Sequence, residues 1–151
     1  GQMMRTTDVI LGGEESGGLS IAGHIPEKDG ILADLLIAEL RAYHKKPLAQ
    51  VLDSIYAKHG RYVNKRLDLR LNSEKKEAVM KNLREKDHKQ IGSWPVDFVN
   101  RIDGVKIVLR NDLWMLARAS GTEPLVRVYL EASSEEELAA LEKEVKAYIG
   151  L

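Results

Sequence analysis

Residues 118–124, Arg-Ala-Ser-Gly-Thr-Glu-Pro, separate two apolar runs at 113–117 and 125–130. Both runs are aliphatic and short enough for strands, so the polar residues between them predict the loop that joins two strands. Upstream, the Asp103-Gly104 dipeptide predicts a tight hairpin turn, and residues 105–109 predict its return strand. Together these segments predict an antiparallel sheet in the second half of the chain.

The chemistry of residues 118–124 suits a phosphate group. Arg118 offers a planar fork of N–H donors, and Ser120 and Thr122 add short hydroxyl groups. Gly121 can adopt a backbone conformation in which successive N–H groups point into one concavity. We therefore predict that Arg118, Ser120, Gly121 and Thr122 hold a phosphate.

A second interpretation of this stretch involves no ligand. Residues 118–124 would then be a polar hairpin loop in which Arg118 pairs with Glu123 or Glu131. Arg127, on the following strand, is a candidate second cation for the phosphate. Arginines at such positions are more often solvated strand residues, so both interpretations of Arg127 stay open.

Helical periodicity and N-cap residues divide the rest of the chain. Asp29 predicts the start of a helix over 30–43, and Asn72-Ser73 predicts the start of another helix further along the chain. Residues 9–11 are predicted to form a short buried strand, and 86–90 a charged, exposed stretch.

The predicted fold class is α+β. Residues 61–151 follow the order strand, helix, antiparallel strands, helix, which predicts an antiparallel sheet with helices packed on one face. Residues 1–60 carry two helices and short strand segments, and are predicted to be the remnant of a partial α/β domain. We expect this remnant to be disordered or to self-associate through uncovered apolar helix positions. Those positions are Leu32, Leu35, Leu36, Val51, Leu52 and Ile55.

A glycine-rich segment at residues 12–18 cannot be the interior of a helix or strand and predicts a loop. Its glycines would let a ligand approach the backbone closely. Glu14 would supply an acceptor and Ser16 a hydroxyl for a polyhydroxylated partner. A tight acidic turn without a ligand explains the same residues equally well.

Composition excludes several classes of function. Lys+Arg and Asp+Glu are both 23, so no global charge favours nucleic acid or an anionic membrane. The chain has no cysteine, which excludes disulfide and thiolate chemistry and makes the reducing cytoplasm the expected location. The four histidines show no mutual metal-ligand spacing, so no metal site is predicted.

The two candidate loops together resemble those of the α-D-phosphohexomutases, the phosphoglucomutase/phosphomannomutase family. Residues 13–17 resemble the family's sugar-binding loop, which belongs to its third domain, and residues 118–124 resemble the phosphate-binding loop of its fourth. Residues 126–131 and 28–31 also fit the family pattern, so the resemblance covers essentially the whole chain. Gly-Glu-Glu-Ser-Gly-Gly resembles the glucose- and mannose-phosphate mutases more than the amino-sugar ones.

The resemblance implies an intramolecular phosphotransferase of the isomerase class. Such enzymes interconvert hexose 1-phosphate and hexose 6-phosphate through a phosphoserine and a bisphosphorylated intermediate, with Mg²⁺ in support. Carried over, Glu14 and Ser16 would bind sugar hydroxyls. Arg118, Ser120, Gly121 and Thr122 would hold the phosphate that is not reacting.

Two family motifs have no counterpart in these residues, namely the loop of the catalytic serine and the aspartate-rich loop that binds Mg²⁺. We therefore expect a C-terminal fragment without catalytic residues or metal ligands, which is inactive alone. Its expected partners are a hexose phosphate and the remaining domains of the parent enzyme. A non-catalytic module that binds a phospho-ligand or another protein is the alternative.

Overall fold

The computed structural model describes residues 2–14, 17–25 and 27–150. The chain divides into two compact units, residues 1–58 and residues 59–151. Each unit is considered by itself. No helix in the described part of the chain is long and apolar enough to cross a membrane.

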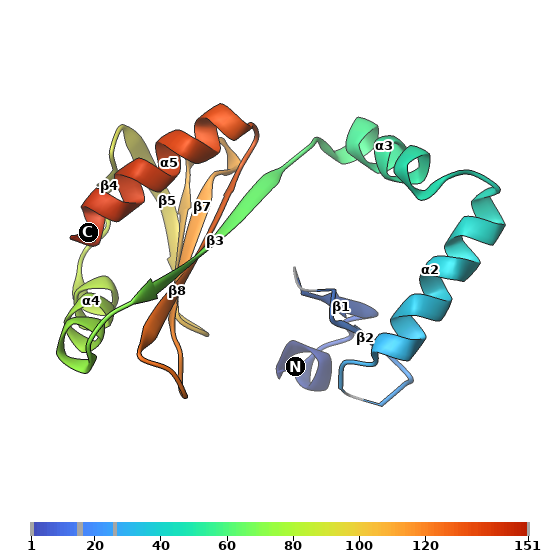
Figure 1. The fold of residues 1–151 in the computed structure, drawn as a ribbon, viewed down its shortest axis with the longest axis horizontal. Helices are drawn as coiled ribbons and strands as arrows, with labels where there is room; N and C mark the ends of the chain where they lie inside the picture. The colour runs from blue at the N-terminus through green and yellow to red at the C-terminus, as the bar shows by residue number, and fades with distance from the viewer. Residues whose placement is uncertain (1, 15–16, 26, 151) are drawn as a thin grey trace. The chain divides into compact units, whose positions relative to one another are not determined.

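The first unit holds a short hairpin and two longer helices (Figure 1). Its elements are α1 (Gln2–Thr6), β1 (Leu11–Gly13), β2 (Leu19–Ile21), α2 (Gly30–His44) and α3 (Leu48–His59). Strands β1 and β2 pair antiparallel, with Leu11 opposite Ile21. As predicted, Asp29 caps α2, because its side chain accepts the Leu32 N–H at 3.0 Å.

The prediction of a buried strand at residues 9–11 is wrong. Strand β1 begins at Leu11, and Leu11 is 57% exposed while Ile10 is 78% exposed. A two-stranded ribbon has no neighbouring strands to bury its side chains. Apolar residues therefore remain in contact with solvent.

Apolar side chains of α2 and α3 also face solvent. Helix α2 has no buried residue, and Leu35 is 64% exposed. In α3, Leu52 and Ile55 are exposed, whereas Val51 is buried. Of the apolar positions predicted to be uncovered, Leu35, Leu52 and Ile55 are exposed, Leu32 and Leu36 are half-buried, and Val51 is buried.

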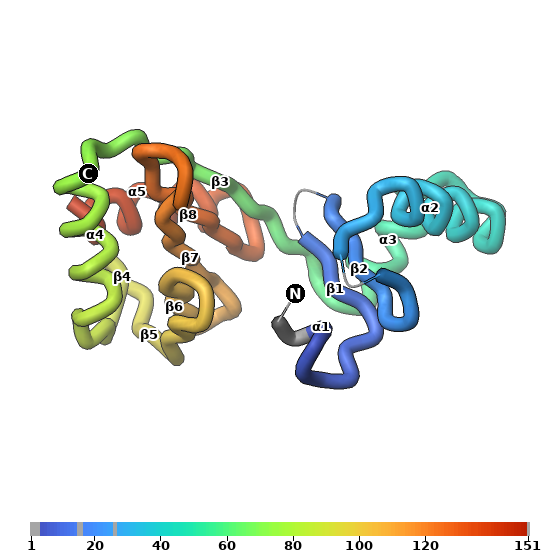
Figure 2. Tube along the Cα trace, turned by 90° about the horizontal axis from the view of Figure 1, so that it is seen from below, coloured from blue at the N-terminus to red at the C-terminus, as the bar shows by residue number. Residues whose placement is uncertain are grey.

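The second unit is a six-stranded antiparallel sheet with helices α4 and α5 beside it (Figure 1). The sheet order is β3-β8-β7-β6-β5-β4. The elements in chain order are β3 (Val63–Arg70), α4 (Ser73–Glu85), β4 (Gln90–Ile91), β5 (Trp94–Asn100), β6 (Val105–Leu109), the 3-10 turn η1 (Arg110–Asp112), β7 (Trp114–Ala119), β8 (Leu125–Ala132) and α5 (Glu135–Tyr148). Figure 2 follows this path along the chain.

Strand β3 lies at one edge of this sheet and pairs along its whole length with β8, with Val63 opposite Ala132 and Arg70 opposite Leu125. The core lies on the face that α4 and α5 cover. Alternate residues of the inner strands and the apolar stripes of both helices form it, including Val105, Ile107, Val126, Val128, Leu130, Leu83 and Leu141. The predicted α+β fold, a sheet with helices on one face, is confirmed.

Residues 86–90 are not an exposed stretch throughout, because His88 is only 7% exposed. Its Nε2 lies 2.7 Å from the Leu83 carbonyl oxygen, and its Nδ1 lies 2.7 Å from the Tyr148 hydroxyl. The last carbonyls of a helix have no partner within the helix. His88 therefore enters the core because it satisfies one of these carbonyls at the end of α4.

Candidate functional site

Arg118 and Ala119 belong to strand β7 and not, as predicted, to the loop after it. They pair with Arg127 and Val126 of β8. The sequence change at Arg118 marks the end of the apolar run, but the ladder continues because β8 still offers pairing partners. The connecting loop therefore comprises residues 120–124.

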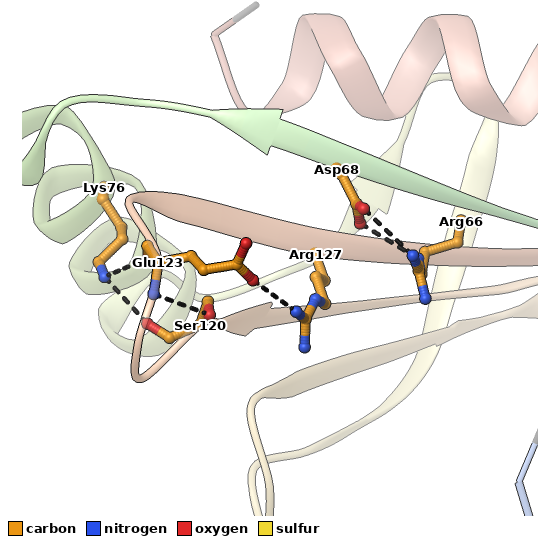
Figure 3. Close-up of polar contacts among 6 residues, drawn as sticks. All are labelled: Arg66, Asp68, Lys76, Ser120, Glu123 and Arg127. Atoms are coloured by element: carbon orange, nitrogen blue, oxygen red, sulfur yellow. Dashed lines mark hydrogen bonds and ion pairs between the residues drawn. The ribbon is translucent and has the colours of Figure 1, made fainter. Parts of the chain in front are cut away.

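The loop is held by its own backbone and by one hydroxyl. The Ser120 N–H donates to the Leu125 carbonyl at 3.0 Å, and the Leu125 N–H donates to the Glu123 carbonyl at 2.8 Å. The Glu123 N–H donates to the Ser120 hydroxyl oxygen at 3.2 Å, as Figure 3 shows. Ser120 is 7% exposed, and its side chain stabilises the loop through this hydrogen bond.

Two N–H groups of the loop remain available. Across the described ranges of the chain, the Gly121 and Thr122 amides donate to no protein acceptor. Both residues are exposed. Successive amides without partners can bind an anion, and their charge-assisted bonds would be stronger than neutral ones.

Gly121 does not adopt the left-handed backbone conformation that favours glycine. Its φ lies outside that region, and a Cβ added to it would meet no heavy atom within 4 Å. The hydrogen bonds described above already turn the chain within residues 120–125. Glycine is thus not required at this position by the backbone itself.

The loop is also anchored from outside, by the segment that follows β3. The Leu71 N–H donates to the Pro124 carbonyl at 3.0 Å. The Lys76 ammonium, from the first turn of α4, donates to the Ser120 carbonyl at 3.0 Å and to the Glu123 carbonyl at 3.3 Å (Figure 3). Sequence reasoning missed Lys76, because its contacts span more than forty residues.

Both candidate arginines have carboxylate partners, although not those predicted for Arg118. An Arg118 Nη lies 3.1 Å from an Asp103 carboxylate oxygen, with both side chains more than half exposed. An Arg127 Nη lies 2.9 Å from Glu123, while Glu131 accepts from the Trp114 indole instead. Exposed ion pairs of this kind contribute about 1 kcal/mol or less, so an incoming phosphate could displace them.

Arg127 lies in a row of charged residues across three strands. Register places Asp68 of β3 and Arg118 of β7 on either side of it. Asp68 pairs with Arg66 at 3.1 Å (Figure 3). The Arg127 Nε is buried and has no hydrogen-bond partner in the described part of the chain. Arg127 therefore has one buried donor that the described residues leave unsatisfied.

The predicted sugar-binding residues belong to the first unit. Glu14 follows β1, and its carboxylate lies 3.2 Å from the Lys28 ammonium, with both side chains about half exposed. Ser16 lies outside the described residues. Nearby, the Leu32 N–H and then His24 hold the pKa of Asp29 below its usual value. The two loops lie in different units, and each is described by itself.

In the described portion of the sequence, no group of three or more His, Asp or Glu side chains is arranged to hold a metal ion. The residues present thus do not fit the Mg²⁺ that the family resemblance implies. We assign no metal ligands here.

The geometry defines a class: an α+β domain in which two amides without protein partners and two arginines lie at the end of an antiparallel sheet. The family model described as phosphoglucomutase/phosphomannomutase, C-terminal domain, matches residues 29–147. The chain belongs to this family.

Relatives and a solved structure agree with this family. The chain is 34% identical over 144 residues to a phosphoglucosamine mutase of Methanocaldococcus jannaschii, covering 95% of this chain and 30% of the relative. It is 34% identical over 128 residues to a phosphoglucomutase/phosphomannomutase of Thermococcus kodakarensis, covering 83% of this chain and 25% of the relative.

A structure of a phosphoglucomutase/phosphomannomutase family protein from Burkholderia thailandensis superposes with a TM-score of 0.68 at 24% identity, covering 97% of this chain and 30% of that one. This likeness concerns the fold alone. The chain thus spans 25–30% of the length of these proteins.

Proposed function

We propose that the chain supplies the phosphate-holding part of a hexose-phosphate mutase. The observation that carries this proposal is the pair of unpaired amides at Gly121 and Thr122, next to Arg118 in a domain of this family. The phosphate would accept from these two amides, from the Thr122 hydroxyl and from the Arg118 guanidinium. Arg127 would add its Nη, released from Glu123.

In such a reaction the held phosphate is the one that does not react. A grip on the remote phosphate provides binding energy and orients the sugar, while chemistry proceeds at its other end. The proposed reaction interconverts hexose 1-phosphate and hexose 6-phosphate through a phosphoserine. No residue described here is assigned to that chemistry, and we expect this chain alone to be inactive.

Glu14 and Ser16 remain the proposed contacts to sugar hydroxyls. The Lys28 ammonium beside Glu14 would then be a neighbouring donor for the same hydroxyls. The relatives named above include phosphoglucosamine as well as glucose and mannose mutases, so they do not support the prediction against amino sugars. We propose a hexose phosphate as the substrate class without choosing among these sugars.

The test is a titration of the isotope-labelled chain with inorganic phosphate and with glucose 6-phosphate, followed by amide NMR shifts. We expect saturable shifts at Gly121 and Thr122. Arg118→Gln should weaken binding about tenfold or more, as expected for a lost hydrogen bond between charged groups. Arg110→Gln, an exposed arginine of η1, is the matched control and should bind as the unchanged chain does.

Two results would count against the proposal. Equal weakening by Arg118→Gln and Arg110→Gln would indicate a general charge effect rather than a site. Turnover of glucose 1-phosphate by the purified chain would show that the chemistry does not require other residues.

A further inference from the structure

Lys76 joins the two ends of the loop at residues 120–124. Its ammonium donates to the carbonyl of Ser120 at 3.0 Å and to that of Glu123 at 3.3 Å. Figure 3 shows Lys76 reaching both residues from one side of the loop. Lys76 is half-buried, so solvent competes only in part with these carbonyls.

The position of Lys76 in its helix is locally unfavourable. Helix α4 begins at Ser73 after the N-cap Asn72, whose side chain accepts the Lys75 N–H at 2.8 Å. The positive end of the helix dipole lies at this terminus and disfavours cations in the first turn. A residue that breaks a local preference is expected to contribute elsewhere, and the loop contact is the contribution visible here.

The contact determines how one peptide group is oriented. No peptide bond in the described chain is cis, so the carbonyl of Ser120 and the N–H of Gly121 point in opposite directions. Because Lys76 draws the Ser120 carbonyl toward itself, the Gly121 N–H points away from Lys76. That N–H is one of the two amides without a protein acceptor.

The charge of Lys76 adds to this orientation. A cation on the carbonyl side polarises the peptide group, which strengthens the N–H on the other side as a donor. Orientation and polarisation therefore act on the same amide.

We propose that Lys76 is a positioning residue for phosphate binding: it holds the Ser120–Gly121 peptide so that the Gly121 amide is presented to the ligand. This inference rests on the proposed function. Lys76 itself does not need to touch the phosphate, because its ammonium is engaged on the opposite side of that peptide.

The experiment compares Lys76→Met with Lys75→Met in the full chain, using inorganic phosphate as the probe. The two substitutions remove the same charge from adjacent residues, and only Lys76 contacts the loop. Lys76→Met should weaken phosphate binding about tenfold, the loss expected for one oriented hydrogen bond to a charged group. Lys75→Met should change it by less than about twofold.

A second readout is independent of phosphate. The carbonyl carbon shifts of Ser120 and Glu123 in the ligand-free chain should move in Lys76→Met and stay in place in Lys75→Met. Lys76→Arg, which keeps the charge and several donors, should restore most of the affinity. Should Lys76→Met fail to fold, Lys76→Gln takes its place with the same expectations.

The outcomes separate the two proposals. If the unchanged chain shows no saturable shift with phosphate, the proposed function fails, and the inference fails with it even if the carbonyl shifts confirm the Lys76 contact. If the unchanged chain binds and Lys76→Met binds as well as Lys75→Met, the positioning role is overturned while the proposed function stands. Equal weakening by both variants also overturns it, because charge alone would then explain the effect.

Discussion

His88 should stabilise the second unit through its two buried hydrogen bonds. The Leu83 carbonyl can only accept, so Nε2 carries the hydrogen, and in the neutral ring Nδ1 then accepts from the Tyr148 hydroxyl. The substitution His88→Leu introduces an apolar side chain of similar size and removes both hydrogen bonds. Tyr148→Phe removes only the second.

The magnitudes follow from what each substitution leaves unpaired. In His88→Leu the buried Leu83 carbonyl loses its partner, which costs about 1–3 kcal/mol. Tyr148 is half-buried and its hydroxyl can bind water, so that loss adds about 0.5–1 kcal/mol. The expected total is about 1.5–4 kcal/mol, or a lowering of Tm by about 6–30 °C for a domain of this size.

Urea unfolding followed by tryptophan fluorescence measures this change. Trp94 and Trp114 both lie in the second unit, so the signal reports on that unit alone. Tyr148→Phe should cost about 1 kcal/mol in the unchanged chain and nearly nothing in the His88→Leu background. A loss below about 0.5 kcal/mol for His88→Leu, or strictly additive effects, would refute the assigned hydrogen bonds.

Two further predictions concern glycine and pH. Gly104 has φ +85°, and a Cβ there would meet the Ala117 carbonyl oxygen, so Gly104→Ala should lower the free energy of unfolding in urea by about 2 kcal/mol or more. Gly121 has open space around it and no left-handed φ, so Gly121→Ala should change this free energy by no more than about 0.5 kcal/mol. Equal losses in the two variants would contradict this reasoning. Lys146 and then Lys65 hold the pKa of Glu142 below its usual value. Because the folded pKa lies below the unfolded one, this stabilisation is present above about pH 4.3 and is lost as pH falls through the folded pKa. Glu142→Gln should flatten that acid limb of the stability curve and Glu144→Gln should not; an unchanged acid limb in Glu142→Gln would count against it.

Local signals in the sequence predicted the parts of the fold that depend on neighbouring residues. Asp29 and Asn72 each bond an N–H three residues later, so a cap and its partner are visible in one short window. The Asp103-Gly104 turn is local in the same way, and Gly104 has the positive φ that such a turn requires. These helix starts and this turn were predictable for this reason.

The errors occur where distant residues decide. Arg118 was assigned to a loop because its side chain is polar, but pairing with Arg127 keeps it in a strand. His88 was assigned to an exposed stretch because its neighbours are charged. In the structure it is buried, and its Nδ1 contacts the hydroxyl of Tyr148, sixty residues later. For Lys76 the sequence holds one faint signal, a pair of lysines in the first turn of a helix.

The pairing of β3 with β8 has a consequence for how the second unit folds. Val63 pairs with Ala132, sixty-nine residues further along the chain, so this ladder closes a long loop. Contacts of such sequence separation form slowly, because the entropy of loop closure is lost before they stabilise the chain. Leu71 and Lys76, which anchor residues 120–124, directly follow β3. During refolding, phosphate affinity should therefore emerge late, with the closing of this ladder, and could serve as a kinetic marker for it.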